Sequence, residues 1–170
     1  MHNNRLDQEG RDLNRCYNLR RPTVIASQIR LLKYRRFDFA ITLYEDYDAH
    51  GIYIYEVSCR KPFWAEHLLE AASEFVPVDP RRTIEGRRAR AGIVRRKLTP
   101  DLMPDWPEAF LLHFYHADRT FTVETPSEFH IEERVAAQIA VLRKAVQLGI
   151  DDRPHFPFNP RAIRAKASSV

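Results

Sequence analysis

Twice along the chain, segments of alternating apolar and polar residues lead into an amphipathic helix. In the first unit the alternation runs from Phe37 to Leu43 and resumes from Ile52 to Val57. Successive side chains of a strand point to opposite faces of a sheet, so each segment predicts a half-buried strand. We expect the two strands to pair as a β-hairpin over residues 37–58.

The second unit predicts another hairpin, over residues 110–125. Phe110, Leu112 and Phe114 alternate with other residues before a short turn, and Phe121 and Val123 alternate after it. A loop at Ala117-Asp118 places Phe114 opposite Phe121 on one face of the hairpin.

Each hairpin is followed by a helical pattern. Over residues 62–76 the apolar residues recur at spacings of three and four, which is typical of a helix with one buried stripe. Over residues 126–148, Thr125 to Glu128 reads as a capping box, and Gly149 is the expected end. The expected core stripe of this second helix consists of Ile131, Val135, Ile139, Leu142 and Val146, widened by Val141, Ala145 and Leu148.

Together these elements predict an α+β fold with two layers. Both hairpins join in one antiparallel sheet, and both helices pack on its apolar face. A length of 170 residues fits one domain, which we place at residues 22–150 with a further helix over residues 23–35. Residues 1–21 are expected to form a flexible polar arm, and residues 151–170 a proline-rich and then basic tail.

The connector between the two units, residues 77–109, concentrates positive charge. Its segment 81–97 has eight basic residues and one acidic residue, a net charge of +7, whereas the whole chain has a net charge of +4. The rest of the chain is therefore slightly acidic. The basic residues are Arg81, Arg82, Arg87, Arg88, Arg90, Arg95, Arg96 and Lys97.

Three interpretations of this segment compete. It is a solvated loop, a contact for nucleic acid through phosphate charge, or a contact for an acidic protein surface. In a homodimer, the acidic loop at Glu45, Asp46 and Asp48 would meet the connector of a second copy. We interpret the chain as a non-catalytic binding protein that uses segment 81–97 to contact nucleic acid or an acidic protein.

The histidines give little support to a metal site. His113 and His116 are three apart on an expected strand and would point to opposite faces. The zinc-peptidase pattern His-Glu-x-x-His does not occur in the sequence, and His130-Ile131-Glu132 lacks the Pro-Cys-x-x-Cys partner of zinc deaminases. No metal or other cofactor is predicted.

The alternative interpretation is a small-molecule-binding protein or a metal-independent enzyme. On the outer face of the second hairpin, His113, Tyr115 and Glu124 would lie close together, and such groups perform acid–base catalysis. Motifs for a P-loop, a dinucleotide fold or a nucleophile elbow are missing, and no motif identifies a family.

The location of the protein is inferred from simple features. The chain has two cysteines, Cys16 and Cys59, no long apolar run and no apolar leader after Met1. These features predict a cytoplasmic protein that has no contact with a membrane.

Overall fold

The computed structural model describes residues 6–18, 22–58, 60–99 and 105–152. Four strands form a mixed sheet in the order β1-β6-β2-β5, and the predicted α+β class is confirmed. The strands are β1 (Ala40–Asp46), β2 (Tyr53–Ser58), β5 (Ile93–Arg95) and β6 (Arg119–Pro126), and the small strands β3 (Thr83–Ile84) and β4 (Arg87–Arg88) pair with each other.

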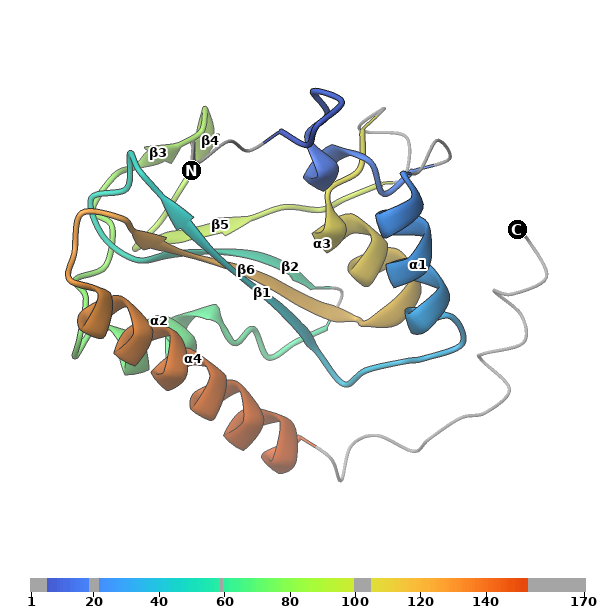
Figure 1. The fold of residues 1–170 in the computed structure, drawn as a ribbon. Helices are drawn as coiled ribbons and strands as arrows, with labels where there is room; N and C mark the ends of the chain where they lie inside the picture. Colours follow the sequence, from blue (N-terminus) through green and yellow to red (C-terminus); the bar gives the residue numbers. More distant parts are fainter. Residues whose placement is uncertain (1–5, 19–21, 59, 100–104, 153–170) are drawn as a thin grey trace.

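The helices lie on the two sides of this sheet (Figure 1). On one side are α2 (Ala65–Ala72) and α4 (Ile131–Asp151), as expected for the two main helices. Near the other side are α1 (Thr23–Leu32), α3 (Glu108–Leu111) and a π-helical turn, η3 (Leu112–His116). No helix of the described segments combines the length and apolar character needed to span a membrane.

The first expected hairpin does not form, because β6 lies between β1 and β2. Strand β6 runs parallel to β1 and antiparallel to β2. It is also the most buried of the three strands, with Phe121 and Val123 completely buried. A central position buries both edges of β6 as well as its faces. Because β6 runs in the same direction as β1, the sheet is mixed instead of antiparallel.

The second expected hairpin is replaced by a helix and a strand. Residues 110–116 belong to α3 and η3, and only the second half of the expected hairpin is a strand, β6. The run Phe110-Leu111-Leu112 fits a helix as well as a strand, since short apolar runs carry no clear period. Phe110 and Phe114 are four apart, and their rings meet on one helix face with centroids 6.1 Å apart.

The main core lies between the sheet and helices α2 and α4. Ile54 of β2, Phe121 of β6 and Leu68 of α2 are fully buried there, and the ring of Trp64 stacks on that of Phe121 at 6.1 Å. Glu56 is buried beside this core, where its carboxylate accepts hydrogen bonds from the N–H groups of Trp64 and Ala65 at the start of α2. These two bonds fix where α2 begins.

Helix α4 begins and ends later than expected. Strand β6 continues to Pro126, and Thr125 donates a hydrogen bond to the carbonyl of Tyr44 instead of capping a helix. The helix begins at Ile131, where Glu133 accepts a bond from the His130 N–H, and it continues through Gly149 to Asp151.

The described part of the basic connector, residues 77–99 and 105–109, belongs to the folded body. Its residues 93–95 form β5, an edge strand parallel to β2, so the apolar residues Ile93 and Val94 anchor the connector in the main sheet. Part of the expected flexible arm is also packed: Leu13–Arg15 form a short helix, and Tyr17 is buried beside α1 and α3. The predicted proline-rich tail, residues 151–170, begins within the end of α4 at Asp151, and its residues 153–170 lie outside the described residues.

Candidate functional site

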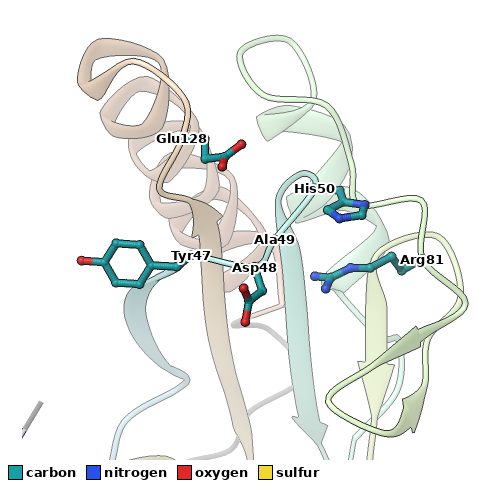
Figure 2. Close-up of a pocket in the computed structure, with 6 residues that line it drawn as sticks. All are labelled: Tyr47, Asp48, Ala49, His50, Arg81 and Glu128. Carbon is teal, nitrogen blue, oxygen red and sulfur yellow. The ribbon is translucent and has the colours of Figure 1, made fainter.

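A polar pocket of about 410 Å³ opens at one end of the sheet (Figure 2). It lies beyond the ends of β1 and β6, which run in parallel and finish together in register at Asp46 and Pro126. The carboxyl ends of parallel strands commonly form ligand sites, because the loops that follow them meet there. The pocket is lined by Tyr47, Asp48, Ala49, His50, Arg81 and Glu128.

Buried Asp79 holds two sides of the pocket together. Its carboxylate accepts bonds from the Arg81 side chain at 2.7 and 2.9 Å and from the His50 N–H at 3.0 Å. Burial acts to raise the pKa of Asp79, but these bonds outweigh burial, and the pKa lies below its ordinary value. Asp79 is therefore a carboxylate at neutral pH and fixes both His50 and Arg81.

A second carboxylate, that of Asp46, holds the loop 47–51 in place. Its side chain accepts hydrogen bonds from the Asp48 N–H and from the Tyr53 hydroxyl, each at 2.9 Å. The Arg81 guanidinium lies 3.9 Å from the same carboxylate and 5.9 Å above the Tyr53 ring. Burial and the adjacent carboxylates of Glu124 and Asp46 raise the pKa of Tyr53, which stays protonated and donates to Asp46.

The backbone beside the pocket is unusually close-packed at Gly51. The next residue, Ile52, donates to the carbonyl of Pro77 at 2.8 Å and accepts from the Asp79 N–H at 3.0 Å. A side chain at Gly51 would collide with the Pro77 carbonyl oxygen and with the backbone of Asp79. Glycine is thus required for the segment that carries Asp79 to approach the loop 47–51.

The free groups of the pocket are mainly acidic. Asp48, His50 and Glu128 are exposed, whereas the charge of Arg81 is already shared with Asp79 and Asp46. Carboxylates and imidazoles are the side chains that most often serve as general acids and bases. The excess of carboxylates favours a cationic group on that molecule.

The predicted group of His113, Tyr115 and Glu124 is divided between two environments. His113 and Tyr115 lie on η3, where their rings meet those of Phe114 and Trp106. Glu124 lies on β6, between Tyr44 and Tyr53 in the sheet register, and its charge helps to raise the pKa values of both tyrosines. The site was predicted from strand geometry that residues 110–116 do not have.

The basic side chains of segment 81–97 fall into three groups. Arg81 binds Asp79, and Arg95 binds Glu56 at 2.6 Å and Glu66 at 2.5 Å. Arg87 and Arg96 are half-buried. Arg82, Arg88, Arg90 and Lys97 are exposed. Two of the eight basic residues therefore serve the fold itself, which the charge count could not reveal.

The pocket was missed because its parts are distant in the sequence. The acidic loop was predicted only as a contact for a second copy, and Arg81 only as part of the connector. Glu128 was assigned to a helix cap. The one available signal was the polar residues that directly follow the ends of two strands, Asp46 and Pro126. That signal indicates a pocket only when the parallel pairing of the two strands is known.

Comparisons with known proteins add the fold relationship. No protein-family model matches the chain, and no curated protein matches its sequence. Crystal structures of three putative metallopeptidases from Shewanella species share the fold. The one from Shewanella amazonensis has a TM-score of 0.70 and 16% identity, over 84% of this chain and 57% of that one.

The other two structures are similarly related. The Shewanella denitrificans structure has a TM-score of 0.64 and 18% identity, over 82% of this chain and 52% of that one. The Shewanella baltica structure has a TM-score of 0.61 and 17% identity, over 77% and 48%. The chain thus spans about half the length of these proteins.

The predicted function is contradicted by these findings. We interpreted the chain as a non-catalytic binding protein that works through segment 81–97, but the solved structures with its fold are putative metallopeptidases. The internal ion pairs of Arg81 and Arg95 also remove part of the charge on which that interpretation depended.

The part of the chain that the structure describes offers no set of ligands for a metal ion. That part contains no group of three or more His, Cys, Asp or Glu side chains that could hold one. His116 is bonded through Nδ1 to the carbonyl of Arg35, and His67 lies beside Glu70 on α2. The described residues therefore do not fit a metal of the kind that the name metallopeptidase implies for those three proteins.

Proposed function

We propose that this protein is a peptide hydrolase. The observation that carries the proposal is the fold: 84% of the chain aligns with a putative metallopeptidase at a TM-score of 0.70. Two further putative metallopeptidases support the same substrate class. Peptide hydrolysis is proposed for this chain as it stands, although it spans about half the length of those proteins.

The pocket of Figure 2 is the proposed place where the peptide binds. Three observations support it: the position beyond two parallel strand ends, the fixed loop 46–51, and the exposed proton-transfer groups Asp48, His50 and Glu128. Asp48 and Glu128 would attract a cationic group of the peptide, and either carboxylate or His50 would accept or donate a proton at the reacting bond.

The test is cleavage of a defined mixture of unstructured peptides by the purified chain, followed by mass spectrometry. Parallel reactions contain a chelator, added zinc, or neither, so that metal dependence is measured instead of assumed. We expect fragments to accumulate in at least one reaction. Removing an acid–base group from a working site lowers kcat/KM by about 10²–10⁴-fold, which is the expectation for Asp48→Asn and Glu128→Gln.

Asp118→Asn is the matched control, because Asp118 precedes β6 and the pocket lies beyond the other end of that strand. Its kcat/KM should equal that of the unaltered chain. A folded protein that yields no fragments in any reaction would contradict the proposal. Cleavage that persists in both pocket variants would show that the chain is a peptide hydrolase whose active site lies outside this pocket.

A further inference from the structure

Helix α4 presents a continuous row of large apolar side chains to solvent. Between 38% and 54% of each of these six residues remains exposed, in a chain where such residues normally face the core. They follow one another at intervals of four, four, three, four and four positions, so they form one stripe. The row consists of Ile131, Val135, Ile139, Leu142, Val146 and Ile150.

A different face of α4 packs against the core. Ala137, Val141, Ala145 and Gly149 are fully buried against the sheet and α2. The two alanines and the glycine among them let α4 approach closely: a side chain at Gly149 would press on the Phe39 ring at 3.0 Å. The exposed row is therefore a second apolar face, separate from the core, and Figure 1 shows α4 at the outer boundary of the molecule.

The row is symmetric about its own midpoint, between Ala140 and Val141. Counting outward from there, Ile139 corresponds to Leu142, Val135 to Val146, and Ile131 to Ile150. A two-fold axis at this midpoint would place each residue against a partner of similar size from an antiparallel copy. Such self-complementarity is the defining property of a contact between identical surfaces.

The size of the surface agrees with a reversible dimer. A helix of 21 residues is about 32 Å long and about 11 Å across. Covering half of its circumference in each copy buries about 1,100 Å² in total, near the lower limit of specific interfaces at about 1,200 Å². The row itself contains no charged side chain whose desolvation would oppose the contact.

A membrane surface fits this face of α4 less well than a second copy of the chain does. Helices that lie on membranes carry mainly Lys and Arg on the polar side, to match anionic lipids. The polar side of α4 instead mixes Glu132, Glu133 and Asp151 with Arg143 and Lys144. We propose that the protein forms a two-fold symmetric dimer through α4, with the two helices antiparallel about the midpoint at residues 140 and 141.

The test is sedimentation velocity of the full chain from about 1 µM to about 100 µM, since interfaces of modest area have affinities in this range. We expect the sedimentation coefficient to rise from the monomer to the dimer value. Ile139→Glu and Leu142→Lys should each raise the dissociation constant at least tenfold. In the proposed register residue 139 meets residue 142 of the other copy, so the double variant should regain most of the affinity through cross-dimer ion pairs.

Gln147→Ser is the matched control, because Gln147 is exposed on α4 and lies outside the half of the helix surface that is centred on the row. Its dissociation constant should not change, and circular dichroism melting should show each variant folded. A chain that is monomeric at every concentration would overturn the proposal and point to a different occupant of the row. A dimer that is indifferent to both single substitutions would overturn it too, whatever the variants' stability. A double variant that stays as weak as the singles would overturn the antiparallel register.

Discussion

At the residue scale, three charged side chains are buried among the described residues, and each has a specific partner. Glu56 bonds to Arg95 and to the start of α2, Asp79 to Arg81, and Arg119 to Asp152 at 3.1 Å. The Arg119 guanidinium also lies 4.3 Å above the Trp64 ring. A buried charge is tolerated only with such partners, so each of these residues fixes the position of neighbouring segments.

Asp79 should make stability depend on pH. Its pKa is lowered in the folded chain, so its contribution is fully present above the unfolded pKa of about 3.9 and is lost as the pH falls through the lower folded pKa. We expect Asp79→Asn to reduce the free energy of unfolding by about 2–4 kcal/mol at pH 7, since it removes one partner of a buried ion pair.

Urea unfolding of both proteins between pH 7 and pH 3 measures this effect. The difference between them should be constant down to about pH 4 and should shrink below it. A difference that stayed the same at pH 3 would show that the Asp79 charge is not its source.

Gly51 offers a sharper steric test. Alanine there would place its methyl carbon within 3 Å of three backbone atoms of the segment Pro77–Asp79. Backbone atoms cannot move aside as a flexible side chain does, so we expect Gly51→Ala to destabilise the fold by about 2–4 kcal/mol. Thermal unfolding measures this. Gly86→Ala is the comparison, because a methyl group there meets no atom within 4 Å and only the positive φ of 71° opposes it, at a cost of about 1–2 kcal/mol. Equal melting temperatures of Gly51→Ala and the unaltered chain would refute the close approach.

At the element scale, α4 shows that a helical period does not say which apolar face is buried. Its sequence predicts Ile131, Val135, Ile139, Leu142 and Val146 as the core stripe, and all five are exposed. Val141 and Ala145, which were expected only to widen that stripe, are completely buried. The buried face is instead made of small residues, because α4 lies close to α2 and to the Phe39 ring. Packing distance, which no single helix contains, decided between the two faces.

Enlarging the small face should therefore cost stability. Ala145 is completely buried, so Ala145→Leu is expected to lower the free energy of unfolding by about 1–3 kcal/mol through overpacking. Gln147→Leu, which places the same side chain at an exposed position of the same helix, should stay within about 0.5 kcal/mol. Chemical denaturation of the two variants decides the point. A larger loss in Gln147→Leu would reverse the assignment of the faces.

At the scale of the whole molecule, the pocket unites parts of the chain that are far apart. The loop after β1, the segment after α2 and the loop before α4 supply His50, Arg81 and Glu128. If peptides bind there, the exposed carboxylates of Asp48 and Glu128 should select a cationic group. We expect peptides with a free amino terminus to be cleaved at least fivefold more efficiently than their acetylated forms.

Competition between free and acetylated versions of one peptide, followed by mass spectrometry, measures this preference. The preference should weaken in Glu128→Gln, and it should weaken with salt because the carboxylates are exposed. Equal cleavage of both versions would show that the pocket does not read the peptide charge.

The sequence by itself determined the fold class and the existence of α2, α4, β1, β2 and β6, since local periodicity and composition are enough to predict amphipathic elements. Only the tertiary structure decided the strand order, the helical state of residues 110–116 and the buried face of α4. It also decided the partners of Arg81 and Arg95. These features depend on contacts between residues far apart in the chain, where burying β6 on all sides and pairing each buried charge outweigh local preference. The pocket belongs to the same class, because parallel pairing of β1 with β6 is what brings its loops together.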